Sequence, residues 1–542
     1  MHLYRGCACL NCRYLSSSPS KPTLIPTRCS DGCNSFRKRK VKCDGRRPIC
    51  KACLTFSPEE CQYADGALSE DQSLESEIES MENRLRRLQN PGELPMTFRD
   101  SMSLHSPYST TSSTSSLRRG LKFRDAPPAI RRKWLHTFIS HAPVFGFFLA
   151  NSKLETQQPS PPLLSAAYLL GALLTRVQDT ASYEQDLLAT TLHETAQGLA
   201  GAHPDRLLQT IQAEVLVANY FFLYGRALEG KYHVTAAVSL VLGAGFHKIG
   251  SSQQQALPRL GLDAPLSLES VAKEIENIRA LWMVLIMNHC WTSADGAASY
   301  IAYDHPESRI DAPWPVDIEY QPSQVLSLRG SDTIEKFLRG NPDDGISLLA
   351  LHAKAAILFE QASFLHRQYR PNMSLKDATR FQSSFNNLDS LIRRFISKLP
   401  PIISSSRPIV LRRLMLINTL ARVSLIQMHY TFSAHDMSSR SLILTTAESI
   451  VLALRNTVLD DFPSIDPIMA TLWGATAKVF IEEIVASRDS SLQSGLHRQR
   501  SPHELMSAVE LVISVMARFS PYSEMMADAH LVQVRQNYAR AK

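Results

Sequence analysis

The chain has 542 residues, of which 44% are apolar and 20% are charged. This length allows roughly two to four domains, and the composition is ordinary for a globular protein, which excludes disorder as the main state of the chain. The net charge of +7 is local, because residues 28–51 contain nine Lys or Arg and two Asp, and the rest of the chain is neutral. A basic patch confined to one segment is typical of a contact with nucleic acid and argues against a uniformly basic enzyme.

The cysteines, like the net charge, are concentrated near the start of the chain. Nine of the ten cysteines lie in the first 61 residues, and the tenth, Cys290, lies in an apolar helical segment. Clustered thiols in a long chain indicate a metal module before a disulfide framework. The sequence has no run of about 18 apolar residues, and its start lacks the apolar core of a secretory signal. We therefore expect an intracellular protein without a membrane span.

Residues 1–27 show no periodicity and are expected to form a disordered tail. Cys7, Cys9 and Cys12 in this tail are interpreted as free thiols, with a metal role as the weaker alternative. Residues 28–62 are predicted to form a zinc domain. Its cysteines are Cys29, Cys33, Cys43, Cys50, Cys53 and Cys61. The two-residue gap between Cys50 and Cys53 lets both sulfurs reach one tetrahedral zinc ion.

The string RKRKVKCDGRRPICKAC at residues 37–53 resembles the fungal zinc binuclear cluster, in which six cysteines bind two zinc ions and two sulfurs bridge both ions. The family has its second cysteine six intervening residues before the third, and that position here is Phe36. The resemblance implies the ligands Cys33, Cys43, Cys50, Cys53 and Cys61, with Cys33 and Cys50 in the bridging roles. One zinc ion then keeps four sulfurs and the other three.

Two interpretations of Phe36 are open. In the first, Cys29 supplies the missing ligand, since its three-residue gap to Cys33 lies within common zinc-ligand spacing, and the cluster binds two zinc ions. In this register the loop to Cys43 is three residues longer than usual. In the second, the cluster is degenerate and binds one ion weakly or none.

Basic residues flank Cys43 on both sides. They are Arg37, Lys38, Arg39, Lys40, Lys42, Arg46 and Arg47. A short helix held by thiolates can present such side chains to a major groove, where most neutralise phosphates and one or two reach base edges. The resemblance implies that Lys40, beside Arg39, reads a CGG-like triplet, and Pro48 matches the proline of the family's loop. The run also has the composition of a nuclear-localisation signal.

A linker at residues 63–73 leads to a predicted short coiled coil at residues 74–89. Apolar residues recur there at alternating steps of four and three, at Leu74, Ile78, Met81, Leu85 and Leu88. This is the spacing of a heptad seam, which predicts a homodimer; because two heptads are marginal alone, a single amphipathic surface helix is the alternative. Residues 90–125 form a linker, in which eleven of the sixteen residues 101–116 are Ser or Thr.

Residues 126–542 are predicted to form one large all-helical domain. Helical apolar patterns occur at 207–226, 230–247, 271–291, 345–370, 374–398, 409–433, 440–457, 465–486 and 503–519, and no strand pattern competes with them. Three segments resemble the middle homology region that follows the zinc cluster in fungal regulators: residues 134–148, 210–250 and 276–300 with the following 310–313. The resemblance covers about residues 126–320.

The sequence thus predicts a mainly α protein with a two-zinc cysteine cluster, a short coiled coil and a large helical domain. The predicted function is a zinc-dependent, sequence-specific regulator of RNA polymerase II genes in the nucleus, which binds double-stranded DNA as a dimer at CGG-type half-sites. Its further expected partners are the transcription machinery or co-regulators and a small-molecule effector. The alternative is a helical interaction or ligand-sensing regulator whose damaged cluster does not bind DNA.

An enzyme in the helical domain is the third class considered, and it lacks a catalytic constellation. Gly243 and Gly245 form a fragment of a dinucleotide motif and are interpreted as a helix end. The pair His289 and Cys290 is interpreted as core packing. The pair at 304–305 is interpreted as a loop hydrogen bond.

Overall fold

The chain divides into two compact units, Met1–Thr111 and Ser112–Lys542. The computed structural model describes residues 50–56, 126–155, 158–175, 181–250, 268–297, 299, 301, 308–317, 331–402, 407–462, 464–489 and 500–542. In the first unit these residues form one short helix, α2 (Lys51–Phe56). The described residues of both units are mainly helical and contain no β-strand.

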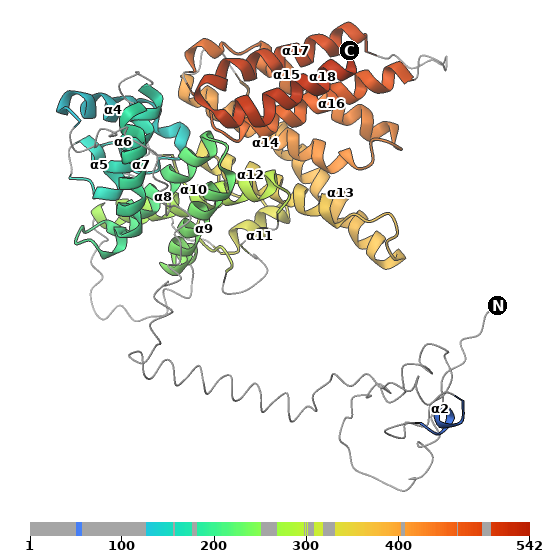
Figure 1. The fold of residues 1–542 in the computed structure, drawn as a ribbon, viewed down its shortest axis with the longest axis horizontal. Helices are drawn as coiled ribbons and strands as arrows, with labels where there is room; N and C mark the ends of the chain where they lie inside the picture. The colour runs from blue at the N-terminus through green and yellow to red at the C-terminus, as the bar shows by residue number, and fades with distance from the viewer. Residues whose placement is uncertain are drawn as a thin grey trace. The chain divides into compact units, whose positions relative to one another are not determined.

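The described residues of the second unit form an array of helices (Figure 1). Its first part comprises α4 (Pro128–His141), the 3-10 turn η4 (Ala142–Phe145), α5 (Ser152–Glu155), α6 (Pro161–Thr175), α7 (Ala181–Ala196), η5 (Gly198–Ala200), α8 (Arg206–Leu223), α9 (Ala227–Gly243), η6 (Phe246–Lys248) and α10 (Leu268–Ala294). Its second part comprises α11 (Thr333–Leu338), α12 (Leu348–Gln368), α13 (Leu375–Lys398), α14 (Pro408–Tyr430), α15 (Met437–Arg455), η8 (Leu459–Asp461), α16 (Met469–Asp489), α17 (Pro502–Phe519), η10 (Ser520–Tyr522), the π-helical turn η11 (Met525–Leu531) and α18 (Val532–Ala541).

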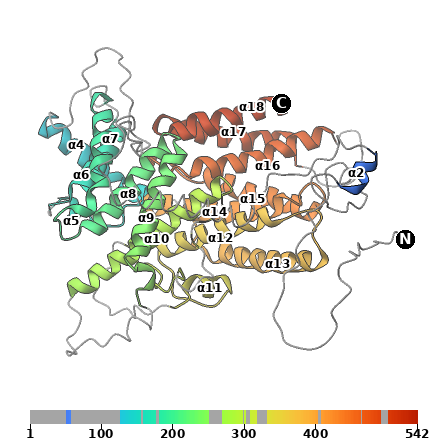
Figure 2. The same cartoon turned by 60° about the horizontal axis from the view of Figure 1, so that its bottom comes forward.

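Each helix packs mainly against helices close to it in the chain. α4 packs on α6, α6 on α7 and α8, α8 on α9, and α9 on α10. The series continues through α12, α14 and α15, while α16 packs on α17 and α18 (Figure 2). The C-terminal turn η11 returns to α8. Just before this turn, the Ser523 hydroxyl donates to the carbonyl of Leu223, the last residue of α8, at 3.3 Å. The array is therefore closed by a contact between residues 300 positions apart.

Helix ends follow the local sequence. The side chains of Ser347, Ser374 and Asp436 accept backbone N–H groups at the starts of α12, α13 and α15. Ser501 and Glu504 form a reciprocal capping box at the start of α17. Such caps satisfy amide groups that lack an intrahelical partner and contribute about 0.5–2 kcal/mol each.

The core of the helical unit is built around large buried side chains. Trp134, Trp282 and Trp473 have no solvent exposure. The Trp282 indole stacks on Trp314 with ring centroids 4.6 Å apart, and its N–H donates to the Pro313 carbonyl at 2.7 Å. α4 and α6 approach closely because position 171 is glycine: a Cβ there would lie 2.1 Å from the Trp134 carbonyl oxygen.

α8 is buried along almost its whole length, and its polar side chains hold the loop that follows η4. Gln212 accepts the Phe148 N–H at 2.8 Å and donates to the Gly146 carbonyl at 3.3 Å. Asn219 donates to the Phe145 carbonyl at 3.2 Å. Buried amides that are satisfied in this way fix loop geometry, because an unpaired backbone group would be costly.

The predicted helical character is confirmed for the described residues of 126–542, and each of the nine segments with a helical apolar pattern contains a helix. The segment 230–247 is shorter than expected, since α9 ends at Gly243 and Gly245 adopts a left-handed φ of 74°. The segment 465–486 begins later, at Met469. α6 and α7 were not predicted as separate helices.

Two stretches are long and apolar enough to cross a membrane on length and composition alone, Leu348–Gln368 and Pro502–Tyr522. The most apolar window of the first is 78% buried inside the protein and that of the second is 39% buried. α12 is apolar because it packs against α10 and α14, and α17 buries one side against α16 and η11. Both belong to the helical array, and the absence of a membrane span stays a prediction.

Candidate functional site

Two of the predicted zinc ligands are described, and they lie together at the start of α2. Cys50 immediately precedes the helix and Cys53 lies in its first turn, with side chains 0% and 2% exposed. The Cys53 backbone N–H donates to Cys50 Sγ with N and S 3.4 Å apart. Two buried sulfurs one helical turn apart fit half of a tetrahedral zinc site. Lys51, between them, is exposed.

The other candidate residues of the N-terminal unit lie outside the described residues. These are the predicted ligands Cys29, Cys33, Cys43 and Cys61, the position Phe36, the basic residues Arg37, Lys38, Arg39, Lys40, Lys42, Arg46 and Arg47, and the dimer positions Leu74, Ile78, Met81, Leu85 and Leu88. Within the described ranges no three His, Cys, Asp or Glu side chains come together as a metal site. The zinc and DNA assignments of these residues stay predictions.

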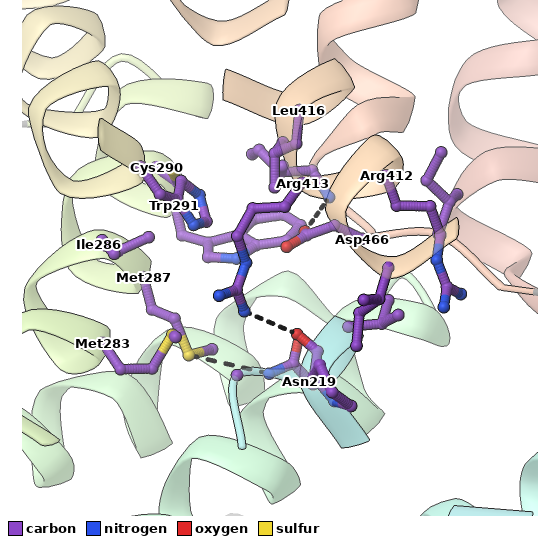
Figure 3. Close-up of a pocket in the computed structure, with 17 residues that line it drawn as sticks. Asn219, Met283, Ile286, Met287, Cys290, Trp291, Arg412, Arg413, Leu416 and Asp466 are labelled. Carbon is purple, nitrogen blue, oxygen red and sulfur yellow. Dashed lines mark hydrogen bonds between the residues drawn. The ribbon is translucent and has the colours of Figure 1, made fainter. Parts of the chain in front are cut away.

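The second candidate site is a pocket inside the helical unit (Figure 3). It lies where η4, α8, α10, α12 and α14 meet the segment before α16, and about 60 Å³ of it is open to water-sized atoms. Its walls are mostly apolar. They include Met283, Ile286, Met287 and Trp291 of α10, Ile409 and Leu416 of α14, and Ile465 and Ile468 before α16. Trp291 is fixed by stacking on Phe222.

Glycine is required at one edge of this pocket. Gly146 has a φ of 68°, a backbone conformation that residues other than glycine rarely adopt,. A Cβ at this position would meet Met283 Sδ at 3.0 Å and Val215 Cγ1 at 3.1 Å. The turn after η4 therefore approaches α8 and α10 closely enough to form the pocket wall.

Five polar or charged side chains also line the pocket: Asn219 of α8, His352 of α12, Arg412 and Arg413 of α14, and Asp466 before α16. Arg412 points away from Arg413 and Asp466 (Figure 3) and donates to the Ser464 carbonyl at 3.2 Å. Arg413 reaches toward Asn219 and donates to the Pro143 carbonyl at 3.3 Å (Figure 3). Burial lowers the pKa of Arg413, and the carboxylates of Asp317 and Asp466 oppose this shift.

The ionisation of Asp466 and of His352 is also set mainly by burial. Burial raises the pKa of Asp466 to about 6, while the Ile468 N–H and the charge of Arg413 favour its ionised form. Burial lowers the pKa of His352 to about 3, helped by the charge of Arg413. At neutral pH the side of the pocket that faces Arg413 thus holds one guanidinium, one carboxylate and a neutral imidazole, and the second guanidinium of the lining, Arg412, points away from them (Figure 3).

The structure describes two of the three minor sequence motifs. Gly243 and Gly245 form a helix end, as predicted. His289 and Cys290 are buried in α10, as predicted for core packing, and burial raises the pKa of the Cys290 thiol well above its usual value. The pair at 304–305 lies outside the described residues.

Sequence reasoning did not find the pocket. Its lining comes from segments as distant as residues 143 and 468, and helical periodicity does not report such long-range contacts. One signal was present. Arg412 and Arg413 interrupt an otherwise apolar helical stretch, LRRLMLINTL, where a charged side chain needs a partner or a function,.

Two sequence families match the chain. The fungal Zn(2)-Cys(6) binuclear cluster domain matches residues 31–69, and the fungal specific transcription factor domain matches residues 130–398. Both families are transcription factor domains and not enzymes. The second match extends beyond residue 320, where the resemblance in the sequence had ended. Cys29 lies just outside the first match.

The chain is also similar to a curated protein of Gibberella moniliformis named transcription factor FBD3. The two are 34% identical over 80 residues. This similarity covers 13% of the present chain and 11% of that relative. The chain thus spans about a tenth of the relative's length, and the likeness is local.

Proposed function

The chain belongs to the fungal transcription factors with a Zn(2)-Cys(6) binuclear cluster and a fungal specific transcription factor domain, and from this premise we propose that it is a sequence-specific, zinc-dependent regulator of RNA polymerase II genes that acts in the nucleus. In this proposal residues 28–62 bind double-stranded DNA at CGG-type half-sites. Residues 74–89 pair two chains, and the helical unit contacts co-regulators or the transcription machinery.

The observation that carries this proposal is the arrangement of Cys50 and Cys53. A six-residue helix with an exposed Leu54 cannot bury much apolar surface, so an organised turn with two buried sulfurs needs another source of stability. Zinc supplies it in modules of this size. When bound, zinc acts as a structural crosslink, and the residues of the chain then make the DNA contacts.

The basic run supports the DNA-binding part of the proposal. It lies within residues 28–51, which together carry the chain's entire net charge, and its cations can release counterions from the DNA backbone. Lys40 is proposed to read a base edge, and Lys38 is proposed to contact phosphate. The two roles predict different losses upon substitution.

The experiment compares Lys40→Ala with Lys38→Ala on a CGG-containing duplex and on a random duplex. Loss of a base contact should cost about 1–3 kcal/mol on the CGG duplex only, whereas loss of a phosphate contact should weaken both duplexes about equally and reduce the salt dependence. Lys51→Ala is a matched control, since this exposed lysine lies outside the basic run. Equal losses on both duplexes for Lys40→Ala would contradict the assignment.

A second candidate function is favoured by Phe36, which occupies a ligand position of the family. Here the cluster is degenerate, and the chain is a ligand-sensing or interaction protein that does not itself bind DNA. Zinc content separates the two candidates. Two zinc ions per chain, falling to one or fewer in Cys29→Ser, support an intact cluster with Cys29 as the sixth ligand; one ion, unchanged by Cys29→Ser, supports the degenerate cluster.

A further inference from the structure

The pocket between η4, α8, α10, α12 and α14 contains opposite charges that are not paired with each other. Arg413 and Asp466 both line it and influence each other's ionisation. In the described part of the helical unit, no carboxylate lies within 4.0 Å of the Arg413 guanidinium as an ion pair. An ion pair inside a protein normally forms directly, because each buried charge alone costs several kcal/mol.

Each of the two charges keeps unused hydrogen-bonding capacity. A guanidinium has five N–H donors, and Arg413 has one hydrogen bond, to the Pro143 carbonyl at 3.3 Å. A carboxylate accepts about four hydrogen bonds, and the Asp466 side chain accepts one, from the Ile468 N–H at 3.0 Å. The remaining donors and acceptors are available to a molecule in the pocket.

His352 is a third group whose hydrogen bonds are missing. Its side chain is buried, with the residue 5% exposed, and neither Nδ1 nor Nε2 has a hydrogen-bond partner. The neutral ring carries one donor and one acceptor, and each unsatisfied buried group costs about 1–3 kcal/mol. His352 lines the same pocket as the two charges. Its position is explained if a ligand completes its hydrogen bonds.

We propose that this pocket binds a small zwitterion with an apolar side chain, in the chemical class of the free α-amino acids. The ligand carboxylate contacts Arg413 and the His352 ring N–H, and the ligand ammonium contacts Asp466. The site is independent of the DNA contacts proposed above, because its lining residues all belong to the helical unit.

The arrangement of charges selects a zwitterion over a simple ion. A carboxylate without a cationic group would meet the Asp466 carboxylate, and an amine without an acidic group would meet the Arg413 guanidinium. Like charges at close range in a poorly solvated site cost more than they do in water. A molecule with both signs satisfies both side chains at once.

The walls and the volume define the rest of the ligand. Met283, Met287 and Ile468 contribute apolar surface to the lining of the same pocket, which suits an aliphatic side chain. About 60 Å³ is open to water-sized atoms, enough for roughly four to six of them at about 10–15 Å³ each. The ligand is therefore no larger than alanine.

The experiment uses the full chain with zinc and without DNA. Thermal unfolding and calorimetric titration are measured with glycine, alanine, valine, proline and leucine, and with two truncated forms of alanine: propanoate, which lacks the ammonium, and ethylamine, which lacks the carboxylate. We expect glycine or alanine to raise the unfolding midpoint progressively with its concentration. Each truncated form should bind about 10- to 100-fold more weakly than alanine.

Variants assign the two ends of the ligand. Arg413→Gln and Asp466→Asn should each weaken amino-acid binding by about 10- to 100-fold, and Asp466→Asn should bind propanoate more tightly than the original protein does. Arg339→Gln and Asp460→Asn are matched controls, since these exposed side chains lie outside the pocket. If Arg413→Gln does not fold, Arg413→Lys replaces it. Lysine keeps the charge but loses the paired N–H donors of the guanidinium, so the loss of binding should lie at the lower end of this range.

Two results would overturn the proposal. One is that none of the amino acids shifts the unfolding midpoint or gives a binding isotherm, in which case water fills the pocket. The other is that Asp466→Asn binds amino acids as tightly as the original protein does. Loss of DNA binding with retained amino-acid binding would overturn the proposed function and leave this inference intact.

Discussion

We expect the two units of this protein to obtain their stability from different sources. The N-terminal unit has a six-residue helix with two fully buried cysteines beside an exposed leucine, whereas the helical unit buries three tryptophans and many aliphatic side chains in a continuous core. A small zinc-cluster module is expected to depend on its metal. A large helical array depends on packing, so conditions that unfold one unit should leave the other folded.

Zinc removal should have the largest effect, and it should affect the two units differently. Chelation should unfold the N-terminal module and abolish specific DNA binding, since structural zinc contributes about 10–16 kcal/mol in small zinc domains. The helical unit should keep its far-UV circular dichroism and its unfolding midpoint. Cys53→Ser should reproduce the loss of zinc, and Cys290→Ala should leave the zinc content unchanged. The comparison would be wrong if chelation lowered the helical content as much as unfolding of the helical unit does.

A core substitution should have the opposite pattern. Trp282→Ala removes a fully buried indole that stacks on Trp314 and bonds to the Pro313 carbonyl. We expect it to lower the free energy of unfolding of the helical unit by about 3–5 kcal/mol, as measured by denaturant titration. Zinc stoichiometry should not change. Tyr232→Ala, at an exposed position on α9, is the control and should change stability little.

The smallest effect concerns the pocket, where a substitution should raise the free energy of unfolding and not lower it. Burial raises the pKa of Asp466 to about 6, above its ordinary value, so the folded state binds the proton more tightly than the unfolded state does. Ionisation therefore costs the folded state stability as the pH rises from about 4 to 6, and the cost is complete above pH 6. Asp466→Asn should stabilise the ligand-free protein at pH 7.5 by about 1–3 kcal/mol.

The pH dependence of this gain provides its own control. Near pH 4 the carboxyl is protonated in the folded state and half-protonated in the unfolded state, so the advantage of Asp466→Asn should nearly vanish. His289 and His352, whose pKa values burial lowers to about 3, titrate alike in both proteins and cancel in the difference. An equal gain at pH 4 and pH 7.5 would show that the carboxylate charge is not its source.

The two units also differ in how much the sequence reveals. The spacing of Cys50 and Cys53 predicted a zinc pair because metal geometry restricts ligand spacing within a short segment. Helical periodicity predicted α8, α10, α12 and α14 because each buries an apolar stripe. The meeting of Arg413, Asp466 and His352 could not be predicted, since it depends on how four helices pack and not on any local pattern.

Helix boundaries show a similar limit. The prediction for α9 continued past Gly243 because apolar residues continue in the sequence, but the left-handed Gly245 ends the helical conformation there. α6 was overlooked because its composition is apolar on nearly every side, and the close contact of Gly171 with α4 buries it without an amphipathic pattern. Tertiary packing supplied the information that the local sequence lacks.

The central claim is that the N-terminal module reads a DNA sequence through a zinc cluster. Selection of the full-length, zinc-loaded protein on a random-sequence DNA pool tests it most directly. The account predicts enrichment of CGG-type triplets, occurring in pairs when residues 74–89 are present and singly when they are deleted. Recovery of DNA without sequence enrichment from zinc-loaded protein would contradict the claim and favour a chain that regulates through its helical unit alone.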